Sequence, residues 1–215
     1  RWGYTAQRPV KRALEQCPER VQRWLRETYP AIAARAKAEG AAIYWADETA
    51  VKEDAHWIRG FAPAGRTPVL EMPARWGKLS MISAITNRGE ISFQIVEGTI
   101  NAERFIEFLA HLLEDATAKV FLIVDNLRVH HAKIVRDWAE PLKDKIELFY
   151  LPPYAPESNP DEHLNHDFKT SLRLEPASDN DNDLMQKAMR IMKRIAQIPG
   201  RVQSYFQHPL AAYAA

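Results

Sequence analysis

The chain has 215 residues, of which 46% are hydrophobic and 27% charged, and its formal net charge at pH 7 is +1. Such a chain can bury one good core and carry an appendage. It contains no run of about 18 apolar residues and no apolar signal core at its start, so we expect neither membrane insertion nor secretion. The single Cys17 cannot form an internal disulfide, which fits a reducing compartment, and we expect a cytoplasmic protein.

The first 40 residues form a basic segment. They hold nine Lys or Arg against four Glu, a net charge of +5, which leaves −4 for the rest of the chain. A basic arm on a mildly acidic body suits a protein that grips phosphate with one part and binds cations with another. Exposed helices rich in Arg would give the same pattern, so charge alone leaves both interpretations open.

Helix signals in this arm begin at Pro18 and Glu19, and Pro30 should interrupt the helix before a second, shorter one ends at Gly40. We expect the aromatic residues of the arm to pack on the body or on a second subunit; they are Trp2, Tyr4, Trp24 and Tyr29. Because the chain begins at Arg1 rather than Met, we expect that a segment upstream is missing.

Strand patterns replace helix patterns from residue 41. The expected strands are 41–48, a short one at Trp57 and Ile58, two flanking a turn at 87–89, then 120–125 and 145–151. The expected helices are 102–116, 130–140 and a further one beyond Asn159. This order predicts an α/β fold with a mixed sheet covered by helices on both faces.

Two buried strands end in an acid, Asp47 after AAIYWA and Asp125 after VFLIV. Ligands of such sheets gather at the carboxyl ends of strands, and hard cations such as Mg²⁺ bind carboxylate oxygens. A third acid, Glu162, follows the proline-stiffened segment LPPYAPESNP. Three acids from distant segments would repel one another unless cations neutralise them, so the pattern predicts a metal-dependent nuclease.

The local sequence around Glu162 also permits a purely structural role. Asn159 as N-cap, Pro160 at the first helical position and Glu162 at the third form a capping pattern, in which the Glu reaches back to the backbone N–H of the cap. Asp161 is a second candidate for the ligand role. The residues alone leave these alternatives open.

Several neighbours of the two strand-end acids are weaker candidates. Glu48 should point to the opposite face of its strand from Asp47, which favours a structural or supporting role. Asn126, His130 and His131 follow Asp125 and are able to position substrate or orient a ligand, although paired histidines at a helix start are more often caps or surface residues.

Basic residues suggest where DNA would bind. Arg59 and Arg66 stand in a loop-rich segment with interleaved Trp residues, a composition suited to holding a distorted or single-stranded DNA end. The helix expected at 183–198 carries Met residues that should pack inward. It also carries basic residues for which DNA contact and a solvated face are both reasonable, namely Lys187, Arg190, Lys193 and Arg194.

Four blocks in order resemble the catalytic core of DDE transposases of the mariner superfamily, bacterial insertion-sequence branch, also called DDE superfamily endonucleases. They are YWADETAV, WIRGFAPAGRTP, VFLIVDNLRVHHAK and FYLPPYAPESNPDEHLNHDFK, and the PPYAPESNPDE block is the most specific. The likeness covers roughly residues 1–175. The segment GYTAQRP resembles the linker that follows a helix-turn-helix DNA-binding region in this family, a region not in this chain.

The resemblance implies an RNase H-like fold, which we place at residues 41–175 after a basic helical arm at 1–40. The C-terminal loop and helix (176–215) match no motif of the family, and we expect them to pack on this fold or extend it. The resemblance also implies that Asp47, Asp125 and Glu162 bind two Mg²⁺ or Mn²⁺ ions. The activity would be cutting and joining of double-stranded DNA at terminal inverted repeats by a nucleoid-associated homodimer. DNA contacts would come from the arm and the loop, at Arg8, Lys11, Arg12, Arg59 and Arg66.

Two other functions remain open at this point. A different RNase H-like nuclease, acting on RNA–DNA hybrids or branched junctions, would use the same three acids, but the PPYAPESNP and GYTAQRP segments would then have no explanation. An inactive DNA-binding remnant of a transposase is the second alternative, and the presence of all three acids argues against it.

Overall fold

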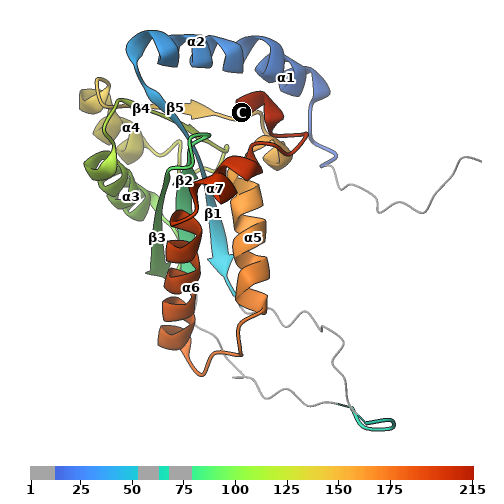
Figure 1. Cartoon of the computed structure of the whole chain (residues 1–215). Helices are drawn as coiled ribbons and strands as arrows, with labels where there is room; N and C mark the ends of the chain where they lie inside the picture. Colours follow the sequence, from blue (N-terminus) through green and yellow to red (C-terminus); the bar gives the residue numbers. More distant parts are fainter. Residues whose placement is uncertain (1–12, 53–62, 68–78) are drawn as a thin grey trace, which may run out of the picture.

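The structure, a computed structural model, describes residues 13–52, 63–67 and 79–215. A five-stranded mixed sheet with strand order β3-β2-β1-β4-β5 forms its centre (Figure 1). The antiparallel pairs are β1–β2 and β2–β3, and the parallel pairs are β1–β4 and β4–β5. The strands are β1 Ala42–Val51, β2 Leu79–Ile85, β3 Ile91–Glu97, β4 Val120–Val124 and β5 Ile146–Tyr150. The mixed sheet is thus confirmed, whereas the short strand expected at Trp57 and Ile58 lies outside the described residues.

Helices cover both faces of the sheet, as the strand sequences require. Every residue of β4 is buried, because alternate side chains of this central strand enter two different cores. One core lies between the sheet and α3 (Ala102–Asp115) with α4 (Lys133–Ala139). The other lies between the sheet and the remaining helices, which are the N-terminal helix, α5 Asp161–Arg173, α6 Asp181–Ala196 and α7 Pro199–Tyr205.

Helix α3 illustrates how local sequence determines these elements. The side chain of Asn101 accepts a hydrogen bond of 2.9 Å from the backbone N–H of Arg104 and so caps the helix. Its apolar residues recur at helical spacing and are all buried against the sheet; they are Phe105, Phe108, Leu109 and Leu112. The expected capped, amphipathic helix is confirmed.

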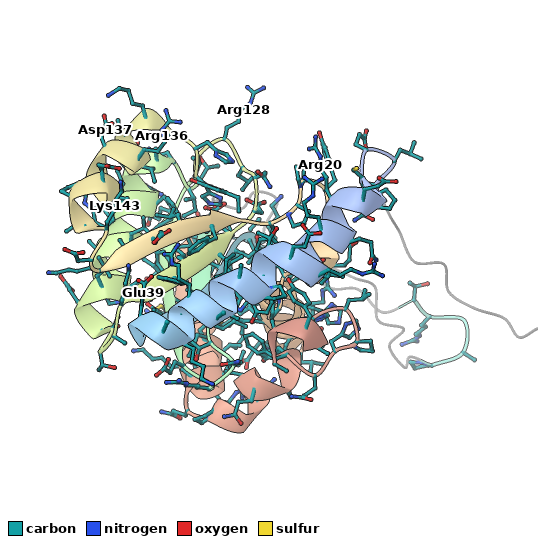
Figure 2. All side chains as sticks on the ribbon, turned by 90° about the horizontal axis from the view of Figure 1, so that it is seen from above. Arg20, Glu39, Arg128, Arg136, Asp137 and Lys143 are labelled. Carbon is teal, nitrogen blue, oxygen red and sulfur yellow. The ribbon has the colours of Figure 1, made fainter. Side chains whose placement is uncertain are left out.

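The N-terminal helix corrects one sequence-based expectation. Pro30 does not interrupt it: α1 (Pro18–Arg23) continues through a π-helical segment (Trp24–Thr28) into α2 (Tyr29–Glu39). A proline lacks an N–H and crowds the carbonyl one turn earlier, and the wider π segment just before Pro30 accommodates both effects without a break. Figure 2 shows the resulting single rod, with Arg20 and Glu39 near its opposite ends.

Aromatic side chains attach this helix to the body. Trp24 and Tyr29 are buried against Trp45 of β1 and Tyr213 near the C-terminus, with ring centroids 5.0 to 6.4 Å apart. The Trp24 indole N–H donates to the Tyr213 hydroxyl over 2.9 Å, and that hydroxyl donates to the Ser158 carbonyl over 2.8 Å. Packing of Trp24 and Tyr29 on the body is confirmed, whereas Trp2 and Tyr4 lie outside the described residues.

The C-terminal residues share the core of the sheet. Arg201 of α7 binds Asp167 of α5 through two hydrogen bonds of 2.7 Å, and the Tyr205 hydroxyl donates to the same carboxylate. Gly89, in the β2–β3 turn, has φ +91°, and a Cβ there would lie 2.6 Å from the Pro199 carbonyl oxygen. The C-terminal segment at Pro199 therefore packs directly on the turn between β2 and β3. The division of the chain into three parts stays a prediction.

Lys187 of α6 was expected to contact DNA or solvent. The structure corrects this expectation, because the side chain does not face solvent. It is 8% exposed, and its ammonium donates to the carbonyls of Pro176 and Ala177 and to the Ser178 hydroxyl. Since these bonds hold the loop before α6, Lys187 is not placed to meet DNA. Short 3-10 turns complete the described fold at Glu140–Leu142, Pro156–Ser158 and Ala212–Ala214. Among the described residues, no helix combines the length and apolarity needed to cross a membrane.

Candidate active site

The candidate site lies where β1 and β4 part. β1 pairs with β4 only from Ala42 to Trp45, while its pairing with β2 continues to Val51. Asp47 therefore lies inside β1 and not at its end, which corrects the expectation from the sequence. Its side chain nevertheless reaches an open cleft, because the β4 chain has turned away. Asp125 follows β4 directly and lies across this gap.

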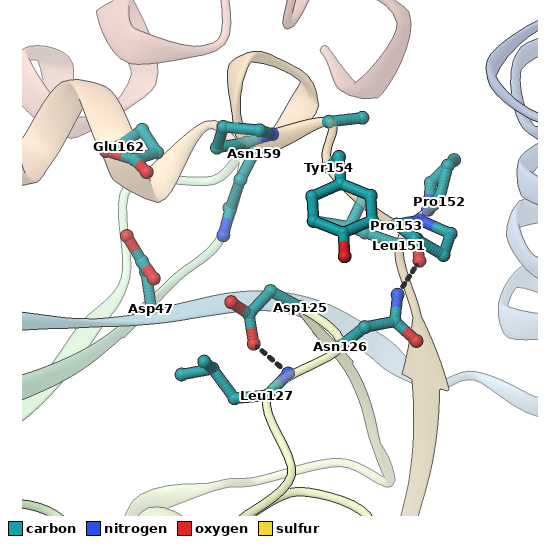
Figure 3. A pocket seen from close by; sticks show the side chains of 12 residues that line it. Asp47, Asp125, Asn126, Leu127, Leu151, Pro152, Pro153, Tyr154, Asn159 and Glu162 are labelled. Atoms are coloured by element: carbon teal, nitrogen blue, oxygen red, sulfur yellow. Dashed lines mark hydrogen bonds between the residues drawn. The ribbon is translucent and has the colours of Figure 1, made fainter. Parts of the chain in front are cut away.

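The start of α5 is anchored to β1 beside Asp47. The Asn159 side-chain amide donates to the Ala46 carbonyl over 3.0 Å, and its oxygen accepts from the Asp161 backbone N–H over 3.1 Å. Pro160 occupies the N-cap position, and its own side chain makes no capping hydrogen bond. The capping pattern considered for Glu162 is thus not formed. Its side chain faces the cleft instead, opposite Asp47 (Figure 3).

All three predicted acids line one pocket of about 470 Å³. Asp47 comes from β1, Asp125 from the end of β4 and Glu162 from the first turn of α5. The opposite wall is less polar and belongs largely to the segment after β5. It comprises Leu151, Pro152, Pro153, Tyr154, Ala155 and Pro156, with Asn126 and Leu127 below and Asn159 between the walls.

The three carboxylates influence one another electrostatically. Burial raises the pKa of Asp47 to about 8, with a further contribution from the charge of Glu162 and a smaller one from Asp125. Burial also raises the pKa of Glu162; Lys169 opposes this rise, and Asp125 adds to it. A cluster of this kind is stabilised by a proton or by a cation.

Asn165 binds Asp47 directly, and sequence reasoning missed it. Its amide donates to Asp47 Oδ2 over 2.8 Å, and the residue is 1% exposed. A signal was present in the sequence, because positions 162 and 165 lie three residues apart on α5 and so share one helix face. An Asn among acids in such a position indicates a donor that orients a carboxylate.

Asp125 is held by a buried histidine. His130, 2% exposed, places Nδ1 3.0 Å from Asp125 Oδ1 and Nε2 3.0 Å from Glu48 Oε1. Burial alone would lower the pKa of His130, but the bonds to Asp125 and Glu48 outweigh it and raise the pKa to about 10. Although burial acts to raise the pKa of Asp125, the His130 bond lowers it overall. Glu48 thus points away from Asp47, as expected, and supports the site through His130.

The remaining neighbours of the acids have other partners. Asp161, the alternative ligand, is fully buried beneath the pocket and accepts a 2.7 Å hydrogen bond from Ser83, so it does not line the cleft. Burial and the charge of Asp47 raise the pKa of Asp161 well above its ordinary value. Asn126 donates to the Leu151 carbonyl, and His131 stacks on Tyr150 with ring centroids 4.1 Å apart.

The carboxylate oxygens of the pocket are donor atoms that suit divalent cations. Within residues 13–52, 63–67 and 79–215, no group of three or more His, Cys, Asp or Glu side chains is already arranged to hold a metal ion. The chemistry of the pocket is nonetheless that of a hard-cation site, since its charged groups are carboxylates. Burial, with a further contribution from the charge of Glu162, raises the pKa of Asp47, and a bound cation would favour its charged form.

The predicted DNA-binding residues are only partly visible. Arg66 is exposed in the short described segment 63–67, where its backbone N–H donates to the Pro63 carbonyl over 2.9 Å. Arg8, Lys11, Arg12 and Arg59 lie outside the described residues. A DNA-binding role for any of them stays a prediction.

Comparison with known proteins identifies the family to which the chain belongs. A family model for DDE superfamily endonucleases matches residues 42–185, which is more than half of the chain. Among solved structures, the Mos1 mariner paired end complex with Mn aligns with a TM-score of 0.65 at 17% identity, covering 100% of this chain and 68% of that one. The Mos1 strand transfer complex aligns with a TM-score of 0.60 at 19% identity, covering 100% of this chain and 67% of that one.

The catalytic domain of Mos1 mariner transposase aligns with a TM-score of 0.56 at 18% identity, over 93% of this chain and 96% of that one. No curated protein matches the sequence significantly. The mixed sheet with helices on both faces, shared with these structures, confirms the expected RNase H-like fold. Within that class, the chain belongs to the DDE superfamily of endonucleases.

Proposed function

We propose that this chain is the catalytic part of a mariner-type transposase, which cuts DNA at terminal inverted repeats and joins the freed ends to target DNA. The observation that carries the proposal is the meeting of Asp47, Asp125 and Glu162 in one pocket of a DDE-family chain. The structural likeness to a paired end complex and a strand transfer complex supports it.

In this proposal the three carboxylates hold two Mg²⁺ or Mn²⁺ ions. When bound, such a pair of ions would activate the attacking oxygen and stabilise the leaving oxygen of an in-line phosphodiester displacement. The contribution of the protein is to orient the ligands. Asn165 directs Oδ2 of Asp47, and His130, backed by Glu48, directs Asp125. No covalent protein intermediate is needed.

The proposed substrate is double-stranded DNA, gripped by Arg66 and by the basic residues beyond the described segments, Arg8, Lys11, Arg12 and Arg59. Replacing Arg59 and Arg66 should weaken binding to inverted-repeat DNA and reduce its salt dependence. We also propose that a homodimer forms on a pair of element ends. Light scattering of the chain with and without end DNA would test this, and a complex of one chain with one DNA end would contradict it.

The decisive experiment is a Mn²⁺-dependent nicking assay on the inverted-repeat DNA that flanks the gene, with RNA–DNA hybrids and branched junctions as competing substrates. The proposal expects preferential nicking at the repeat end. Asp47→Ala, Asp125→Ala and Glu162→Ala should each abolish it while leaving the fold intact. Asp137→Ala is the matched control, since that exposed carboxylate pairs with Lys133 away from the pocket. Preference for hybrids or junctions would favour a different RNase H-like nuclease.

A further inference from the structure

The wall of the active-site pocket opposite the acids has properties that phosphodiester chemistry alone does not require. Carboxylates and cations need to surround only a phosphate, yet the pocket of about 470 Å³ extends along the segment 151–156. That volume lies in the range of pockets that hold whole small organic ligands. The additional space is bordered by an aromatic ring, two prolines and a leucine, namely Tyr154, Pro152, Pro153 and Leu127.

Tyr154 is presented to solvent at this wall. The residue is 58% exposed, whereas Tyr29, Tyr44 and Tyr205 are buried. Figure 3 shows its ring across the pocket from Glu162, with the hydroxyl end directed toward Asp125 and Asn126. Leu127, on the loop after Asp125, is 46% exposed. An aromatic ring left open beside charged groups offers a stacking surface to a planar ligand.

The backbone holds the ring in this place. Tyr154 has φ +59°, and among the described residues no other non-glycine residue has a positive φ. A bulky residue adopts this conformation at a cost in free energy, so its surroundings must impose it. Gln16 from the N-terminal segment does so in part, because its amide donates to the Tyr154 carbonyl over 2.9 Å and to Glu157 Oε1 over 2.6 Å.

We propose that Tyr154, with Leu127 on the neighbouring loop, forms a subsite for one unpaired nucleobase next to the phosphate held by the carboxylates. The base stacks on the Tyr154 ring, while its phosphate faces Asp47, Asp125 and Glu162. This rests on the proposed function, and it adds which residues of this chain receive the unpaired base. Stacking on an aromatic face tolerates any base, so the subsite would favour unpaired ends over particular sequences.

The test measures affinity, with Ca²⁺ in place of a catalytic ion. Hairpin DNA with a short 3′ tail of thymidines is compared with the same hairpin carrying an abasic tail. Wild type should bind the thymidine tail about tenfold more tightly, the effect of one stacked base. Tyr154→Ala should lose this preference, and Tyr154→Phe should keep it. Leu127→Ala should lose a smaller part of the preference for the thymidine tail. Leu210→Ala, at a similarly exposed leucine, should lose none of it.

Two results separate the failure of this inference from the failure of the proposed function. If wild type binds both tails equally, or if Tyr154→Ala weakens both to the same extent, the stacking subsite is wrong while the transposase proposal stands. If wild type neither binds nor nicks any DNA with a divalent cation present, the proposed function itself fails. Circular dichroism of each variant checks that the fold is retained.

Discussion

Asn165 donates a hydrogen bond of 2.8 Å to Oδ2 of Asp47, and this buried contact joins α5 to β1 beside the pocket. Removing such an orienting partner typically costs about 10- to 100-fold in metal affinity or activity. Asn165→Ala should therefore weaken Mn²⁺ binding and slow DNA nicking by about that factor. Calorimetric titration with Mn²⁺ measures the first effect, and the nicking assay the second.

Asn87→Ala is the matched control, because Asn87 donates over 3.1 Å to the Ala214 carbonyl at the far end of the sheet. It should leave metal affinity unchanged. Equal Mn²⁺ affinity of Asn165→Ala and wild type would show that the contact has no role in ligand orientation.

The raised pKa of Asp47 makes stability depend on pH. Its value of about 8 exceeds the ordinary 3.8, so the folded protein holds this proton more tightly than the unfolded chain. The contribution to stability is full below about pH 3.8 and is lost as pH rises through 8. At pH 8 without metal, Asp47→Asn should raise Tm, by about 2–4 °C for each kcal/mol of relieved repulsion.

Differential scanning calorimetry at pH 5 and pH 8 checks this prediction, and the gain should be larger at pH 8. Mn²⁺ should raise the Tm of wild type, because the cation neutralises the charge of Asp47. It should not raise the Tm of Asp47→Asn, which has no charge at this position. Asp137→Asn, at an exposed carboxylate, should change Tm little at either pH. A lower Tm of Asp47→Asn at pH 8 would contradict the prediction.

His130 should make stability depend on pH in the same direction, over a higher pH range. Its pKa of about 10 lies above the ordinary 6.5, so its contribution is full below about pH 6.5 and is lost as pH rises through 10. Breaking a buried charge pair costs about 3–5 kcal/mol. His130→Gln should destabilise the protein by roughly this amount at pH 6, with a smaller loss at pH 10.

Urea unfolding at both pH values measures this difference. His111→Gln is the matched control, since His111 lies at an exposed position 3.8 to 3.9 Å from two acids of α3. It should cost less than about 1 kcal/mol. A loss at His130 that is independent of pH would show that the imidazole is not held as a cation between Glu48 and Asp125.

Gly89 tests the packing of the C-terminal segment on the sheet. Gly89→Ala should destabilise the fold by more than about 1 kcal/mol, because the residue has φ +91° and the new Cβ would meet the backbone of Pro199. Gly200→Ala, in α7 with open space around it, should be neutral or stabilise by about 0.4–1 kcal/mol. Chemical denaturation of both variants measures the contrast, and equal effects would contradict the close contact.

Elements with strong local signals were predictable from sequence. Helix 102–116 carries its own cap at Asn101 and an apolar stripe, and β4 is apolar throughout, so both were recognised with nearly correct bounds. Pro30 was misjudged, because a π segment that relieves a proline leaves no mark in local propensity. The extension of β1 beyond Glu48 to Val51 was also missed, since it depends on pairing with β2.

The sequence by itself determined the set of candidate acids and the family that the chain resembled, because residue identity and spacing carry that information directly. Only the tertiary structure decided where each acid lies. Glu162 faces the pocket while Asp161 is buried on Ser83, and Asn165 and His130 reach Asp47 and Glu48 from distant segments. These outcomes depend on strand register and helix docking, which are long-range interactions that no local pattern specifies.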